Sequence, residues 1–98
     1  MTTNPPKLYL LVYASTLGTR EEVKNCLDSI PEILRWRTDL PSSFYLSSTK
    51  TADELVDLII KRRGKQGRFV ISEITLNTQG WLQPDTWAFL GRTLRKQS

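Results

Sequence analysis

Histidine is absent from this 98-residue chain, and its absence excludes much enzyme chemistry. There is no imidazole general base, no Ser-His or Cys-His dyad, and no histidine ligand for zinc. The single cysteine, Cys26, excludes an internal disulfide and is typical of a protein kept in a reducing, cytoplasmic setting. No apolar run approaches the roughly 20 residues that cross a bilayer, so we expect no membrane association.

What is present is the composition of one small globular domain, with 39% hydrophobic and 24% charged residues. A chain of this length buries a modest core, which favours the burial of further surface in a homodimer. The formal net charge of +4 is mildly basic and is compatible with RNA, DNA or an acidic protein partner.

Residues 7–15, KLYLLVYAS, are the most apolar stretch and predict a strand that is buried on both faces. Leu8, Leu10 and Val12 alternate with aromatic and apolar residues that point to the opposite side. A strand without a polar side needs cover above and below, so we expect it in the middle of a sheet.

Two capping boxes mark helix starts, because a threonine is followed three residues later by a glutamate at Thr19–Glu22 and at Thr51–Glu54. Apolar side chains follow each box at helical spacing and form one stripe per helix. The first helix is expected to end before Pro31. The second ends in a basic turn followed by Gly64, a residue suited to a helix C-terminus.

Three further stretches, residues 32–38, 43–48 and 68–76, are typical of strands. The resulting β-α-β-β-α-β order predicts a ferredoxin-like α+β fold, with a four-stranded antiparallel sheet and two helices on one face. We expect residues 1–6 to be a flexible leader and residues 7–76 to be the domain.

Residues 77–98 form a C-terminal tail, and Pro84 is expected at the start of a short helix within it. Its apolar face can cover the open face of its own sheet or that of a partner, and the sequence leaves both alternatives open. Aromatic residues assigned to dimer or tail packing are Tyr9, Tyr13, Trp81 and Trp87.

Three segments, KLYLLVY, FYLSSTKTADEL and RFVISEITLNTQGWLQPDTWAFL, resemble a group of small bacterial proteins of the SinR type. These proteins are similar in turn to the small CRISPR-associated nuclease of the spacer-acquisition complex and to VapD-type endoribonucleases. The resemblance covers residues 7–90, and its most specific part is the last strand with the Gly-Trp-Leu that follows it.

This resemblance implies a ferredoxin-like homodimer. In the nuclease members an aspartate follows the tyrosine that ends the first strand, and two such aspartates are thought to hold a divalent metal that activates water. Here Ala14 follows Tyr13, so the metal position is degenerate and we expect no catalysis and no cofactor. If activity is retained, it would be that of an Mg-dependent endoribonuclease. Glu73 is the candidate replacement carboxylate, and its alternative interpretation is a structural cross-strand partner.

Seven cations are candidate contacts to a nucleic-acid backbone. Five lie within eight residues at the end of the second predicted helix and in the loop after it, and two lie on one face of the second predicted strand. The alternative for all of them is an ordinary solvated surface. They are Lys61, Arg62, Arg63, Lys65, Arg68, Arg35 and Arg37.

Besides a true nuclease that uses Glu73 or another carboxylate around a metal, two functions are compatible with these features. The first is a catalytically degenerate, homodimeric relative of the CRISPR-associated and VapD-type endoribonucleases that binds the backbone of RNA or DNA. The second is a protein-interaction module with an antitoxin-like or assembly role, which the tryptophan-rich tail and the apolar sheet favour.

Overall fold

The computed structural model describes residues 5–95 of the chain. Within them the strands are β1 (Lys7–Tyr13), β2 (Arg35–Arg37), β3 (Ser43–Ser48) and β4 (Phe69–Ile74). The helices are α1 (Arg20–Asp28), α2 (Ala52–Arg63) and α3 (Pro84–Arg95).

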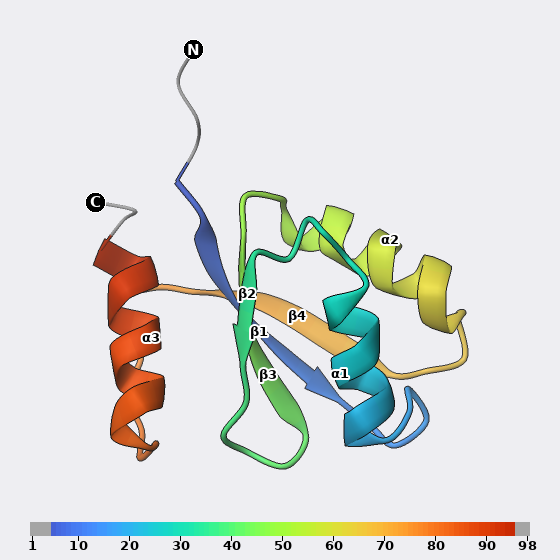
Figure 1. The fold of residues 1–98 in the computed structure, drawn as a ribbon, viewed down its shortest axis with the longest axis horizontal. Helices are drawn as coiled ribbons and strands as arrows, with labels where there is room; N and C mark the ends of the chain where they lie inside the picture. Colours follow the sequence, from blue (N-terminus) through green and yellow to red (C-terminus); the bar gives the residue numbers. More distant parts are fainter. Residues whose placement is uncertain (1–4, 96–98) are drawn as a thin grey trace.

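The strands form one antiparallel sheet in the order β2-β3-β1-β4, so the first and third strands are central and the other two form the edges. Helices α1 and α2 lie on one side of the sheet and α3 lies on the other (Figure 1). The predicted ferredoxin-like α+β fold is therefore confirmed, and the tail adds a third layer.

The two helices on the first face begin at the predicted capping boxes. The Thr19 hydroxyl accepts the Glu22 N–H at 3.2 Å, and the Thr19 N–H donates to the Glu22 carboxylate at 2.8 Å. Thr51 and Glu54 repeat both contacts at 3.2 and 2.9 Å. With their starts fixed, α1 and α2 turn their apolar stripes toward the sheet and bury them there.

Helix α3 covers the second face of the sheet of its own chain, which resolves the alternative left open by the sequence. Phe89 and Leu90 of α3 form a buried cluster with Leu8 of β1, Tyr45 of β3 and Ile74 of β4. The odd–even alternation of β1 explains this second cluster, since Leu8 points away from the face that α1 and α2 cover.

Polar contacts fix the first turn of α3 to the β2–β3 hairpin. The Asp39 carboxylate accepts the backbone N–H of Gln83 at 2.7 Å, directly before the helix. From the end of β2, Arg37 donates to the Thr86 hydroxyl at 3.1 Å and lies 3.9 Å from the Asp85 carboxylate. A carboxylate at a helix N-terminus is favourable, so Asp39 has a structural role here.

Strand β2 is shorter than the predicted 32–38, and the turns on either side of it explain the difference. A turn in which the Ile33 N–H donates to the Ile30 carbonyl at 3.1 Å precedes the strand. After the strand, the Thr38 hydroxyl donates to the Ser43 carbonyl at 2.9 Å and begins the hairpin turn. The strand is thus limited to Arg35–Arg37, which pair with β3, and the Leu34 N–H adds a hydrogen bond to the Ser47 carbonyl at 2.8 Å.

The predicted leader, residues 1–6, falls mostly outside the described residues. Of its two described residues, Pro5 is exposed and Pro6 is half-buried.

No helix in residues 5–95 has the length and apolar character needed to cross a membrane.

Candidate nucleic-acid interface

Ala14 lies at the exposed end of β1, and its N–H donates to the Arg68 carbonyl at 2.9 Å. Glu73 pairs in register with Tyr9, toward the other end of the same strand. Ala14 lies five positions after Tyr9 along the chain, a distance of about 17 Å in a strand. Within one copy of the chain, Glu73 therefore does not replace a carboxylate at position 14.

The surroundings of Glu73 fit the structural interpretation of this residue. Its carboxylate lies 4.0 Å from the Lys7 ammonium, and both side chains are partly exposed. Among residues 5–95 there is no group of three or more His, Cys, Asp or Glu residues that could hold a metal ion. Ala14 at the end of β1 and the distant Glu73 therefore do not fit the divalent metal that the resemblance implies for its nuclease members.

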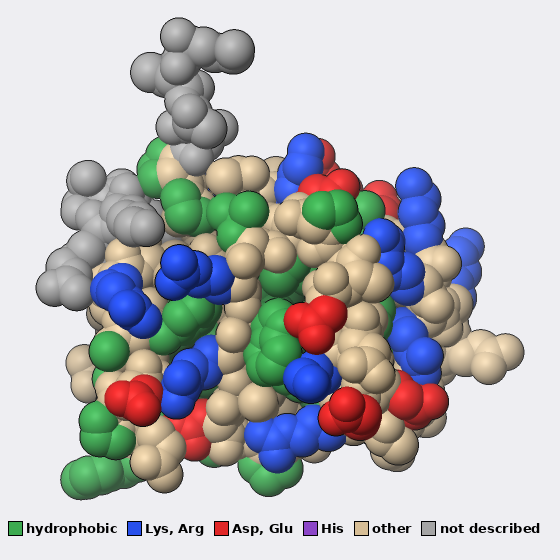
Figure 2. Space-filling view, viewed as in Figure 1, with side chains coloured by type: hydrophobic (Ala, Val, Ile, Leu, Met, Phe, Trp, Pro, Cys, Tyr) green, Lys and Arg blue, Asp and Glu red, His purple; other side chains and the backbone are tan. Residues whose placement is uncertain are grey.

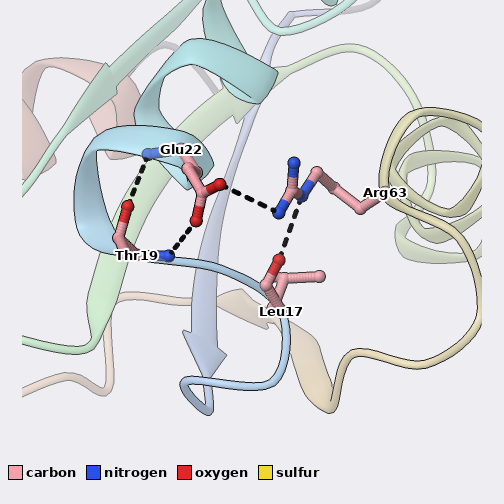
Figure 3. A network of polar contacts seen from close by, with 4 residues as sticks. All are labelled: Leu17, Thr19, Glu22 and Arg63. Atoms are coloured by element: carbon pink, nitrogen blue, oxygen red, sulfur yellow. Dashed lines mark hydrogen bonds and ion pairs between the residues drawn. The ribbon is translucent and has the colours of Figure 1, made fainter.

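Two of the predicted phosphate contacts, Arg62 and Arg63, form hydrogen bonds to other segments of the same chain. Arg62 donates to the Ser29 hydroxyl at 2.8 Å and to the Ser29 carbonyl at 3.0 Å, which joins the end of α2 to the end of α1. Arg63 donates to the Leu17 carbonyl at 3.0 Å and lies 3.9 Å from the Glu22 carboxylate (Figure 3). Both arginines therefore connect secondary-structure elements.

Around the loop that follows α2, the exposed residues Lys61, Lys65 and Arg68 have side chains without a hydrogen bond or ion pair to any described residue. Gly67 allows this loop to approach the β1–α1 loop closely, because a Cβ at this position would lie 2.6 Å from the Leu17 Cα. Lys65 and Arg68 thus project from a loop that packs against the protein, and Lys61 projects from the last turn of α2.

The arginines of β2 lie on the opposite face of the sheet, beside α3. Arg37 is held by Thr86 and Asp85, as described above. Arg35 is exposed, and its side chain has no hydrogen bond or ion pair within residues 5–95. The side chain of Arg92 in α3 is also exposed and has no hydrogen bond or ion pair to a described residue, although Arg92 is not among the residues predicted from the sequence. Arg92 follows Phe89 by three residues, and this helical spacing, which places it next to the buried face of α3, could have indicated it from the sequence.

Arg35, Arg37 and Arg92 line one hollow of about 450 Å³ at the edge of the sheet, which we call the arginine groove. Other parts of its wall come from Phe89 of α3, Trp36 of β2 and Asp28 of α1. A smaller hollow of about 100 Å³ shares Arg35, Phe89 and Arg92. Asp85 pairs with Arg37, so Arg35 and Arg92 together with Asp28 leave the arginine groove with one net positive charge.

The predicted cations do not form one continuous surface. Lys and Arg side chains gather on the left of Figure 2, over α3 and towards β2, and on the right, over α2 and its end, and others lie at the lower centre, over α1. The arginine groove lies beside α3 and β2, whereas Lys65 and Arg68 lie in the loop after α2. A concave basic surface concentrates positive potential more than separated side chains on a loop do.

The aromatic residues divide between core and surface. Tyr9 and Tyr13 belong to the core beneath α1 and α2, so they do not pack against the tail. The Tyr9 hydroxyl donates to the Lys50 carbonyl at 2.6 Å, and burial, with the Glu73 and Glu54 carboxylates nearby, raises the pKa of this phenol.

The two tryptophans of the tail differ from each other. Trp87 packs against the cluster that holds α3 on the sheet. Trp81, in the connection before α3, is 98% exposed. Trp81 therefore contributes little to the packing of the tail.

No protein-family model, curated protein or solved structure matches this chain. The resemblance to the SinR group remains a prediction based on the residues quoted above.

Proposed function

We propose that this protein binds the phosphate backbone of a nucleic acid in the arginine groove and does not cleave it. The observation that carries the proposal is the pair Arg35 and Arg92, two guanidinium groups that line one groove and have no carboxylate partner among the described residues. Guanidinium groups match the geometry of phosphate oxygens and remain charged at every physiological pH.

The position of the two arginines supports the proposal further. Arg35 lies on a strand and Arg92 on a helix, and the hydrogen bond from Arg37 to Thr86 holds these two elements together. Like charges that share a groove repel each other, so an anion between them removes an unfavourable interaction. Because both residues lie on secondary structure, the backbone of the site loses little conformational freedom on binding, and the cost of ordering falls on the two side chains.

The absence of cleavage is part of the proposal and rests on Ala14 and Glu73. No carboxylate is present at position 14, and the Glu73 carboxylate lies toward the other end of β1. The protein would then be a binding relative of the endoribonucleases that its sequence resembles.

The proposal is tested by fluorescence anisotropy with a labelled single-stranded RNA and a labelled single-stranded DNA at low salt. The double variant Arg35→Gln/Arg92→Gln should bind at least about tenfold more weakly, because it loses two charge-assisted contacts. The matched control is Lys65→Gln/Arg68→Gln, which removes the same charge from the loop after α2. Equal losses in both variants would show that binding follows net charge and would overturn the assignment of the site.

A second candidate function is a protein-interaction module, and two exposed valines favour it. Val12 and Val70 are cross-strand neighbours on the face that α3 partly covers, and they are 41% and 59% exposed. The partner of this candidate is a second copy of the chain, joined through this patch and the β4 edge. Light scattering should then give a dimeric mass for the wild type and a monomeric mass for Val70→Asp. A monomeric wild type at high concentration would remove this candidate.

A further inference from the structure

Trp36 is an aromatic side chain held in a fixed position on the wall of the arginine groove. Its indole N–H donates to the Asp28 carboxylate at 2.7 Å. Its ring meets Phe44 edge-on, with a centroid separation of 5.4 Å and an interplanar angle of 80°. The side chain is half-buried and lines the groove together with the arginines, so part of the indole remains accessible.

The groove passes around the outer edge of β2. Successive side chains of a strand point to opposite faces, so Trp36 lies on the side of α1, whereas Arg35 and Arg37 lie on the side of α3. Because all three line one hollow, a ligand at this edge can meet the indole on one side and the guanidinium groups on the other. A nucleotide has chemical groups that suit both sides, because it carries an aromatic base at one end and a phosphate at the other.

We propose that the arginine groove is selective for single-stranded nucleic acid, with one base against Trp36 and a neighbouring phosphate between Arg35 and Arg92. This inference rests on the proposed function. A volume of about 450 Å³ lies within the range of roughly 300–1,000 Å³ found for pockets that enclose small ligands. The bases of a duplex are paired and stacked, so only a single strand offers a free base to the indole.

The inference is tested with the whole chain and three DNA probes of equal length, namely oligothymidine, an abasic strand and a duplex. An oligouridine of the same length separates a preference for RNA from a preference for a free base. We expect the abasic strand and the duplex to bind at least about fivefold more weakly than oligothymidine, which is the smallest effect typical of losing one stacked base.

Trp36→Ala should abolish this difference, whereas Trp36→Phe should preserve part of it, because phenylalanine keeps an aromatic face. Trp81→Ala is the matched control, since Trp81 is almost fully exposed and does not line the groove. Thermal unfolding of each variant shows whether it folds.

A second measurement leaves Trp36 in place. The variant Trp81→Phe/Trp87→Phe retains Trp36 as its single tryptophan, and oligothymidine should quench its fluorescence. Binding without quenching would contradict the position of the base.

The outcomes separate the two proposals. If the three DNA probes bind equally and binding still depends on Arg35 and Arg92, the selectivity for a single strand is wrong and backbone binding stands. If no probe binds at low salt, both proposals fail.

Discussion

Arg35, Arg37 and Arg92 have the same charge and line the same groove, yet their surroundings give them different roles. Arg37 is half-buried and donates to Thr86, so its guanidinium is part of the contact between β2 and α3. Arg35 and Arg92 are exposed, and no described acidic side chain lies within ion-pair distance of them. Removing Arg37 should therefore affect stability, whereas removing the other two should affect anion binding.

At the same scale, we predict that Arg63→Ala destabilises the protein. The substitution leaves the Leu17 carbonyl without its charged donor and removes the ion pair with Glu22. We expect a loss of about 1–2 kcal/mol in the free energy of unfolding, measured by urea denaturation. The matched control is Lys61→Ala, which removes the same charge from the same turn of α2. An equal effect of the two substitutions would contradict the role given to Arg63.

A second prediction at this scale concerns acid. Hydrogen bonds from the Thr19 backbone and side chain hold the pKa of Glu22 below its ordinary value of 4.5, and the Arg63 charge lowers it further. The Thr51 backbone N–H has the same effect on the pKa of Glu54. A carboxyl whose pKa is lower in the folded state stabilises the protein above its unfolded-state pKa, and this stabilisation disappears as the pH falls through the folded-state value.

Urea denaturation between pH 6 and pH 3 should accordingly show a loss of stability on acidification, starting near the ordinary glutamate pKa. Glu22→Gln should make the profile flatter, because glutamine does not titrate. Glu21→Gln removes the same charge from the first turn of α1 without affecting the capping box, and it should leave the profile steep. A Glu22→Gln profile as steep as that of the wild type would count against this account.

At the scale of elements, the docking of α3 extends the predicted fold. Apolar contacts of Phe89 and Leu90 secure the middle of the helix, and the hydrogen bond from Gln83 to Asp39 secures its start. Because α3 provides one wall of the arginine groove, its docking also brings Arg92 into the hollow that Arg35 lines.

We predict that Phe89→Ala weakens both stability and binding. Truncating a buried phenylalanine costs about 3–5 kcal/mol in the free energy of unfolding, and α3 should then lose its fixed position. Leu76→Ala is the control, because Leu76 is 75% exposed. Urea denaturation and anisotropy measure the two effects. Binding at wild-type affinity in a folded Phe89→Ala variant would show that the groove does not need α3.

The elements that were predicted well are those with local signals. Capping boxes determined the starts of α1 and α2, and β3 agrees with its predicted range of 43–48. The length of β2 depends on the turns beside it, and the position of α3 depends on which sheet face lacks cover. Both are set by tertiary contacts, which residue periodicity does not encode.

At the scale of the whole molecule, the same limit applies to the site. The sequence placed five cations together at the end of the second helix and in the loop after it, but proximity in the chain did not show that Arg62 and Arg63 form hydrogen bonds with other elements. The pairing of Arg35 with Arg92 needs the three-layer arrangement, because 56 residues of chain separate them. The arginine groove therefore depends on the tertiary fold, and no local sequence motif predicts it.

The most direct test of the central claim is the salt dependence of binding to a labelled single strand, compared between the wild type and Arg35→Gln/Arg92→Gln. Each phosphate that is neutralised on a single strand contributes about −0.7 to the slope of log K against log salt concentration. If both arginines contact phosphates, the double substitution should make the slope shallower by about 1.4. An unchanged slope, with the loss appearing instead in Lys65→Gln/Arg68→Gln, would contradict the account and place the nucleic acid at the loop after α2.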